Sequence, residues 1–394
     1  MSKRKPSDET LLIHSGYIPP EGFLSLSTPI HHASPVVFGS VHAYRARREQ
    51  LYDGYMYGLL GTPTTMVLAQ RIADLEGGTR AVLAPSGLSA INMVYFTFLK
   101  QGDHVLVPDN AYGPSRHLCN TVLKGLGVQV TFYDPMIGAG IADLMNNDTR
   151  LVWVESPGSI TMEVPDIPAI VKAAHARDAL VAIDNTWSAG VYFKPFRHGC
   201  DISVQALTKY IGGHADLLLG AAIVNDEILY RRLKDTASAF GLGASPDDCF
   251  LALRGMPTLI ARLQRHQASA LTVAAWLKQR PEVKQVLHPA FPDCPGHEIW
   301  RRDFTGASGL FSVIFQDNYA ESAVDRMVDS LEYFRIGASW GGPVSLVLPL
   351  NPHDIRSAVP WTEKGALVRF SIGLEDPTDL IDDLETGLSR IAID

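Results

Sequence analysis

The sequence has few cysteines, no long apolar run and no surplus of positive charge. Its four cysteines, Cys119, Cys200, Cys249 and Cys294, lie far apart and form no CxxC pair, which argues against a zinc site and leaves no disulfide framework. No run reaches the length of a membrane span, and the charged N-terminus lacks the apolar core of a signal peptide. We therefore expect a cytoplasmic protein with reduced thiols and no membrane partner.

The charge balance argues against two further classes of partner. Lys and Arg number 34 against 42 Asp and Glu, so the net charge is −8, and no basic block is present. Neither nucleic acid nor an anionic membrane surface is an expected partner. The chain has 394 residues, 46 % of them hydrophobic and 19 % charged, which is enough for two domains with a large core and is ordinary for a soluble enzyme.

Changes of pattern divide the chain into three predicted parts. Residues 1–60 contain several prolines and little periodicity, so we expect an N-terminal arm of a kind that often reaches a neighbouring subunit. Residues 61–255 alternate apolar strand-like runs with helical spacing, which predicts an α/β domain with a mainly parallel sheet covered on both faces. Residues 256–394 begin with a long helical stretch and continue with strands and helices, which predicts a smaller α+β domain.

One lysine follows a buried strand-like run. Residues 202–207 are mostly apolar and lead into Thr208, Lys209 and a glycine-bearing turn. A lysine at the end of a buried strand loses hydration, which favours its neutral amine, and a neutral amine can form a Schiff base with the aldehyde of pyridoxal phosphate (PLP). A surface lysine at a strand end would give the same pattern, so other residues must decide between the two interpretations.

Other candidate residues follow neighbouring strands, at the edge where parallel sheets bind ligands. The stretch Ser86-Gly87-Leu88-Ser89 lies between a strand and a helix, where backbone N–H groups could bind a phosphate. Asp184 could keep a pyridine nitrogen protonated, or it could be a helix N-cap. Tyr112 could stack on a cofactor ring, act as an acid or base, or simply be packed.

A late arginine completes this set of residues. Arg369 is a cation within the apolar run 367–372, and its fork could hold the α-carboxylate of an amino acid, with an internal ion pair as the structural alternative. His214 and the pair His31-His32 have no ligand companions at useful spacing, so we predict no metal site. A PLP enzyme that acts on an amino acid requires such a set in this order: a turn that binds phosphate, an aromatic residue, an aspartate, a lysine and an arginine.

Longer stretches carry a resemblance to a known family. They are Leu75-Glu-Gly-Gly78, Gly102-Asp-His-Val-Leu106, Glu155-Ser-Pro-Gly-Ser-Ile-Thr-Met-Glu163, Ile183-Asp-Asn-Thr-Trp187, Thr208-Lys-Tyr210, Arg302-Asp-Phe-Thr-Gly306, Ser339-Trp-Gly-Gly342 and Ile372-Gly-Leu-Glu-Asp376. The chain resembles the trans-sulfuration family of PLP-dependent enzymes over nearly its whole length, and within it the cystathionine β-lyases. The resemblance implies PLP fold type I: a large α/β domain with a mainly parallel seven-stranded sheet, a smaller C-terminal α+β domain and an N-terminal arm. It also implies a homotetramer of tight dimers with shared active sites.

The resemblance further implies roles for individual residues. Lys209 would hold PLP as a Schiff base and act in catalysis, Asp184 would contact the pyridine nitrogen, and Tyr112 would stack on the ring. Ser339 would position the lysine, and Arg369 would bind the substrate carboxylate. The remaining expected contacts are Gly87, Leu88, Thr208 and Tyr57 for the cofactor, and Trp340 together with Ser339 for the substrate.

The departures from the family pattern fall at the distal end of the substrate pocket. Cystathionine β-lyases have Tyr-Gly-Arg-Arg-Gly where residues 57–61 here are Tyr-Gly-Leu-Leu-Gly. Leu59 and Leu60 thus replace two cations, of which the first helps to bind cofactor phosphate across the dimer and both lie near the distal group. Ala338 replaces an aromatic residue and should enlarge the same region. We infer that the distal end accepts a neutral or cationic group.

These residues favour a PLP-dependent lyase that eliminates a heteroatom leaving group from a small amino-acid substrate. The first hypothesis is carbon–sulfur β-elimination, which converts cystathionine or another cysteine S-conjugate to pyruvate, ammonia and a thiol. Leu59 and Leu60 favour an alternative, a γ-lyase that acts on a neutral or cationic-tailed substrate such as canavanine and yields homoserine and hydroxyguanidine. A third alternative is a catalytically weakened binding or regulatory homologue.

Overall fold

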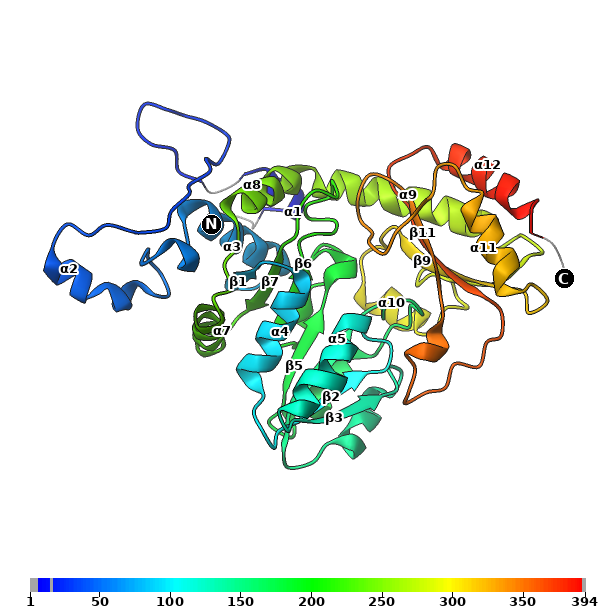
Figure 1. Ribbon diagram of the computed structural model, residues 1–394, viewed down its shortest axis with the longest axis horizontal. Coiled ribbons are helices and arrows are strands. Elements are labelled where there is room, and N and C mark those ends of the chain that lie inside the picture. Colours follow the sequence, from blue (N-terminus) through cyan, green and yellow to red (C-terminus); the bar gives the residue numbers. More distant parts are fainter. Residues whose placement is uncertain (1–5, 15–16, 392–394) are drawn as a thin grey trace, which may run out of the picture.

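Two β-sheets organise the computed structural model of the chain, which describes residues 6–14 and 17–391. Within these residues the larger sheet has seven strands, in the order β1-β7-β6-β5-β4-β2-β3 (Figure 1). They are β1 (Arg80–Ala84), β2 (His104–Pro108), β3 (Gln129–Tyr133), β4 (Thr149–Glu155), β5 (Leu180–Asp184), β6 (Ile202–Ala206) and β7 (Gly220–Val224). Strand β7 is antiparallel to β1 and β6, and the other neighbours are parallel. The predicted mainly parallel seven-stranded sheet is confirmed.

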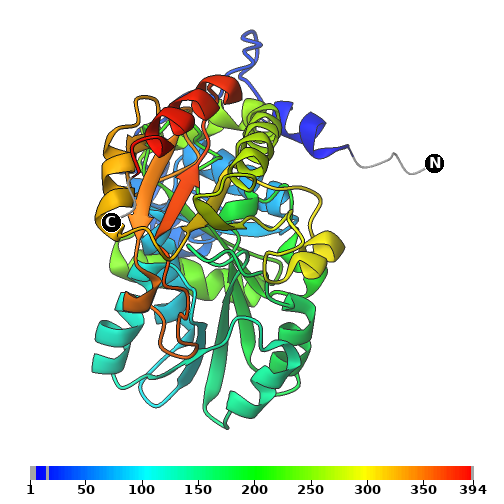
Figure 2. The same ribbon diagram turned by 90° about the vertical axis from the view of Figure 1, so that its right-hand side faces the viewer.

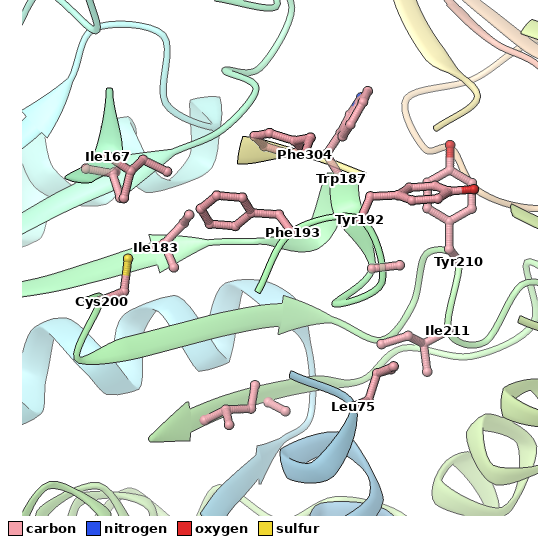
Figure 3. Packing of buried hydrophobic residues seen from close by; sticks show 14 of the residues in the cluster. Leu75, Ile167, Ile183, Trp187, Tyr192, Phe193, Cys200, Tyr210, Ile211 and Phe304 are labelled. Atoms are coloured by element: carbon pink, nitrogen blue, oxygen red, sulfur yellow. The ribbon is translucent and has the colours of Figure 1, made fainter. Parts of the chain in front are cut away.

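Helices cover both faces of this sheet, which explains why its strands are apolar on both sides. They are α3 (Pro63–Glu76), α4 (Gly87–Phe98), α5 (Gly113–Leu118), α6 (Ile167–His175), α7 (Glu227–Phe240) and α8 (Pro246–Gly255). On one face, Leu75 of α3 and Ile167 of α6 belong to the same core as Ile183 of β5 (Figure 3). On the other face, α4 and α7 pack into a core that contains Trp153 of β4. The sheet is thus held between two helical layers.

A second sheet forms the smaller unit. Its five strands among the described residues have the order β10-β11-β12-β9-β8: β8 (Val283–Leu287), β9 (Leu310–Phe315), β10 (Arg335–Ile336), β11 (Leu346–Leu350) and β12 (Leu367–Ser371). The helices of this unit are α9 (Leu259–Leu277), α10 (His297–Asp303), α11 (Glu321–Asp329) and α12 (Pro377–Leu388). In Figure 2 this unit, coloured yellow to red, lies against the larger one. The boundaries predicted at residues 60/61 and 255/256 remain predictions.

The N-terminal segment extends away from both sheets, as Figure 1 shows for the region around α2 (Val41–Arg45). It begins with α1 (Asp8–Ile13), and residues 1–5 and 15–16 of the predicted arm lie outside the described residues. Many of its large apolar side chains are exposed, including Leu24 at 92 % and Leu26 at 99 %.

The described helices are also short or polar relative to a bilayer. None of them is both long enough and apolar enough to cross a membrane.

Candidate active site

A cavity of about 340 Å³ lies at the carboxyl ends of the parallel strands, where sheets of this type bind ligands. The larger unit contributes strand ends and the start of α4, and the smaller unit contributes β12 and the segment before β11. The predicted site residues that line the cavity are Gly87, Leu88, Tyr112, Asp184, Thr208, Lys209, Ala338, Ser339, Trp340 and Arg369. The fold therefore brings together residues from distant parts of the chain.

Lys209 lies in the turn after β6, with its amine in the cavity. Its Nζ donates a hydrogen bond of 2.7 Å to Ser339 Oγ and lies 5.1 Å from the centroid of the Trp340 ring. Burial, together with the positive charge of Arg369, lowers the pKa of Lys209 to about 8, although the Asp184 carboxylate opposes this shift. Near neutral pH a far larger fraction of this amine is neutral than for a solvated lysine, as Schiff base formation requires.

Two carboxyl groups lie side by side at the ends of β4 and β5, because Glu155 and Asp184 are directly paired in the sheet. Asp184 accepts a hydrogen bond of 3.0 Å from Thr186 N. Glu155 accepts bonds from Tyr112 N at 2.7 Å and from Ser159 Oγ at 2.5 Å. Burial and the charge of Asp184 raise the pKa of Glu155 to about 8, and burial also raises the pKa of Asp184, against the effects of Thr186 and Lys209. Glu155 therefore keeps a proton at neutral pH.

Glu155→Gln is expected to change how stability depends on pH in the cofactor-free protein. The pKa of Glu155 rises from 4.5 to about 8 on folding, so this group stabilises the fold fully below pH 4.5 and the contribution is lost as the pH rises through 8. Because glutamine does not ionise, the thermal midpoint of the variant should exceed that of the wild type by roughly several degrees near pH 8 and approach it near pH 5. Glu298→Gln, at an exposed side chain, is the control, and identical pH dependence in both variants would contradict a protonated Glu155.

Tyr112 occupies the turn between β2 and α5, and its ring is half exposed to the cavity. Burial and the negative charges of Asp184 and Glu155 raise the pKa of Tyr112, although Arg369 opposes the shift. The phenol is thus protonated at neutral pH. This state suits stacking on a ring better than action as a base.

The start of α4 has the geometry of a phosphate site. Ser86 is the N-cap, and its Oγ accepts a hydrogen bond of 3.0 Å from Ser89 N. The N–H groups of Gly87 and Leu88 have no acceptor inside the helix and lie at the cavity. A Cβ on Gly87 would lie 2.6 Å from Ala206 Cβ, so glycine allows this helix end to approach β6. Thr208 Oγ1 bonds to the backbone of Leu219.

Arg369 lies on β12 and enters the cavity from the smaller unit. Its Nη2 donates a hydrogen bond of 3.0 Å to Ala338 O, and burial lowers its pKa to about 10, so the guanidinium remains charged. No carboxylate of the described residues forms an ion pair with it, which removes the internal ion pair as an explanation and leaves its fork available for a ligand carboxylate.

Three predicted site residues lie elsewhere in this chain. Tyr57 Oη is 3.3 Å from Ser34 Oγ in the arm. Leu59 and Leu60 line a separate cavity of about 170 Å³ between the arm, α3 and α7, where Lys234 Nζ donates to Leu60 O. These residues are absent from the lining of the Lys209 cavity, so within one chain they do not belong to the site.

The set of groups in the Lys209 cavity fits PLP. The amine with a lowered pKa suits the aldehyde of PLP, and the buried carboxylate suits its pyridine nitrogen. The aromatic ring can stack on the planar cofactor ring, and the helix N-terminus can bind the phosphate. The sequence places Glu155 at the end of a predicted strand, at the ligand-binding edge of the sheet, but gives it no role, because only the sheet register shows that it lies beside Asp184.

Comparisons with known proteins agree with this fit. The family model described as Cys/Met metabolism PLP-dependent enzyme matches residues 9–389. A putative cystathionine beta-lyase of Rhizobium johnstonii is 44 % identical over 383 residues, which cover 96 % of this chain and 95 % of that protein. Cystathionine beta-lyase MetC of Escherichia coli is 42 % identical over 389 residues, with coverage of 97 % and 98 %. The structure of cystathionine gamma synthase from Xanthomonas oryzae in complex with aminoacrylate and cysteine superposes with a TM-score of 0.89 at 32 % identity, covering 98 % and 99 %.

Proposed function

Because the chain belongs to the Cys/Met metabolism family of PLP-dependent enzymes, we propose that this lyase cleaves a carbon–sulfur bond by β-elimination. Cystathionine or another cysteine S-conjugate is the substrate, and pyruvate, ammonia and a thiol are the products. The observation that carries the proposal is that Lys209, Asp184 and Arg369 line one cavity. Relatives with the name cystathionine beta-lyase support the choice of reaction.

The residues of the cavity divide the work of binding and proton transfer. When bound, PLP withdraws electrons from the α-carbon of an attached amino acid and so makes its α-proton acidic. Arg369 binds the α-carboxylate through its free N–H groups. Lys209 Nζ removes the α-proton and is held in place by Ser339 Oγ, 2.7 Å away. Asp184 keeps a proton on the pyridine nitrogen.

The other walls of the cavity orient the reactants and exclude water. Tyr112 would stack on the cofactor ring, and the backbone N–H groups of Gly87 and Leu88 at the start of α4 would bind its phosphate. Apolar side chains complete the enclosure, among them Ile160, Met162, Trp187 and Leu310. This arrangement favours an enzyme over the binding or regulatory alternative, because Lys209, Asp184, Tyr112 and Arg369 all line the cavity.

A specific observation favours a second candidate, γ-elimination from a substrate with a cationic tail. Leu59 and Leu60 replace two arginines, and Ala338 on the cavity wall leaves room for a longer side chain. A lost arginine deprives a distal carboxylate of its partner and spares a guanidinium from repulsion. Canavanine is the example that fits this chemistry: the Cγ–O bond breaks to release hydroxyguanidine, and a water molecule then adds at Cγ to give homoserine.

A competition between cystathionine and canavanine separates the two candidates. Purified protein loaded with PLP is given both substrates, and every product is identified by mass. Pyruvate and homocysteine establish β-elimination from cystathionine, whereas homoserine with hydroxyguanidine establishes the second candidate. If neither substrate is consumed, the proposed function fails.

The leucine pair gives a prediction on specificity. Leu59→Arg with Leu60→Arg should raise kcat/KM for cystathionine relative to canavanine by about tenfold or more, since a distal carboxylate in the site of a neighbouring copy gains a cationic partner. Leu126→Arg, at an exposed position in the turn before β3, is the control for added charge. An unchanged ratio in the double variant would disprove this interpretation of the pocket.

The arm supports the proposal of a homotetramer of tight dimers with shared sites. Tyr57 and Leu59 lie outside the cavity of their own chain and are 46 % and 42 % exposed, so they reach a site only in a second copy. Exposed apolar side chains such as Leu24 and Leu26 are covered in such an assembly. Light scattering of the purified protein tests this, and a monomeric mass would refute it.

We also place the protein in the cytoplasm. Its four cysteines are buried free thiols in the structure, and buried thiols suit a reducing compartment. Fractionation of the source cells with immunodetection checks this assignment, and recovery outside the cytoplasm would contradict it.

A further inference from the structure

The segment between β11 and β12 leaves the smaller sheet and contacts the larger unit. Figure 1 shows it in orange, descending toward α5. The backbone N–H groups of Ser357, Ala358 and Val359 donate to the carboxylate of Asp109 at 2.8–2.9 Å, and Ser357 Oγ donates to it at 2.9 Å. Asp109 follows β2 and is fully buried. Although burial alone would raise its pKa, these donors hold the pKa of Asp109 below its ordinary value, so the carboxylate is charged and bound.

The same carboxylate stabilises the turn that carries Tyr112. Arg116 Nη1 donates to Asp109 Oδ1 at 2.9 Å and to Asp109 O at 3.0 Å, and Arg116 N donates to Tyr112 O at 3.1 Å. Arg116 Nη2 also donates to Ser357 Oγ at 3.1 Å. Asp109 and Arg116 thus flank Tyr112 in the sequence and hold its turn in place. Residues 357–359 of the smaller unit supply the other hydrogen bonds of these two side chains.

A second buried ion pair binds the cavity wall to this turn. Arg356 Nη2 lies 2.5 Å from Glu163 Oε1, and both side chains are almost fully buried, at 6 % and 7 % exposed. Glu163 Oε2 also accepts hydrogen bonds from Asn110 Nδ2 at 2.9 Å and from Thr161 Oγ1 at 2.5 Å. Asn110 belongs to the Tyr112 turn, and residues 157–160 and 162 line the cavity. A Cβ on Gly158 would lie 1.8 Å from Asn110 Nδ2, so the wall and the turn are in direct contact.

We propose that residues 356–359 form a latch that fixes Tyr112 and the cavity wall of the larger unit relative to Arg369 of the smaller unit, with Arg356 as a positioning residue for substrate binding. Residues 360–366 join the latch to β12, which carries Arg369, and Tyr112 and Arg369 line the same cavity. Both anchors, Asp109 and Glu163, are charged groups in buried surroundings, where losing one partner is strongly unfavourable. The roles of Tyr112 and Arg369 rest on the proposed function, but the latch is a property of the fold.

The test compares Arg356→Met and Ser357→Ala with Arg301→Met in the PLP-loaded protein. Arg301 is an exposed arginine of α10 paired with Glu298, so its variant controls for the loss of a surface arginine. Ser357→Ala removes the hydroxyl contacts and keeps the backbone N–H, so it should fold even if Arg356→Met is unstable. Amide hydrogen exchange of the peptide that contains residues 109–116 and the kinetic constants are measured for each variant.

In Arg356→Met, the backbone amides of residues 109–116 should exchange their hydrogens at least about tenfold faster than in the wild type. KM should rise about tenfold, and kcat should change by less than about threefold. Ser357→Ala should move both quantities in the same direction by about threefold, and Arg356→Lys should recover most of the loss because its ammonium can pair with Glu163. Unchanged exchange in both folded variants overturns the latch, and faster exchange with unchanged KM overturns the positioning role. If the wild type turns over neither substrate, the proposed function fails independently of the latch. The affinity of each variant for glycine is then measured in place of KM.

Discussion

Lys209→Ala eliminates covalent attachment of PLP and lowers kcat by at least about 1000-fold. The variant lacks the amine that would form the Schiff base with the cofactor and would remove the α-proton, and proton transfer by a positioned group alone contributes about 10²–10⁴ to the rate. The neighbouring groups should stay in place, since Lys209 Nζ forms one hydrogen bond, to Ser339. Loss of turnover should therefore occur without loss of the folded state.

Two measurements check this result. Borohydride reduction followed by peptide mass mapping should add one phosphopyridoxyl group to Lys209 in the wild type and none to the variant. Lys172→Ala, at an exposed lysine of α6, should match the wild type in absorbance and turnover. A variant without Lys209 that retains either the adduct or appreciable turnover would contradict the assignment.

Arg369→Leu should raise KM for amino-acid substrates by about 100-fold, because loss of a buried charge-assisted contact to a carboxylate costs about 2–5 kcal/mol. Leucine matches the apolar neighbours on β12, and no described carboxylate is left unpaired, so stability should change little. Arg369→Lys should be intermediate, because an ammonium keeps the charge and loses the planar fork.

The control for this prediction is Arg335→Leu, an exposed arginine on β10 of the same sheet. It should leave KM and kcat near the wild-type values. Steady-state kinetics with the thermal midpoint of each variant separate binding from folding. A KM for Arg369→Leu within about threefold of the wild type would exclude Arg369 as the carboxylate partner.

Much of the candidate site could be predicted because parallel strands place their carboxyl ends at one edge of a sheet. Gly87, Tyr112, Asp184 and Lys209 each follow an apolar run that is a strand in the structure, so a local pattern was enough to select them. The family resemblance added Ser339 and the seven-stranded sheet, and the fold is confirmed. Local patterns could not show that β7 runs antiparallel, since an apolar run has no direction.

The contacts that could not be predicted are those made by tertiary packing. Asp109 and Ser357 are 248 residues apart, and nothing in the sequence around either one identifies the other as its partner. The pairing of Glu155 with Asp184 depends on sheet register, which follows from the packing of whole strands and not from the residues at their ends. The placement of Leu59 and Leu60 outside the cavity likewise depends on the path of the arm.

The exposure of Leu59 has a consequence for how such an enzyme diversifies. The groups proposed to hold the cofactor and the reacting end of the substrate lie in the packed interior, where a side chain on Gly87, for example, would meet Ala206. The turn with Leu59, by contrast, is 42 % exposed, and substitutions at exposed positions usually change stability by less than about 0.5 kcal/mol. Mutations at Leu59 that alter the preferred leaving group can therefore accumulate at little cost to the folding of the single chain, so the reaction is retained while the preferred substrate changes.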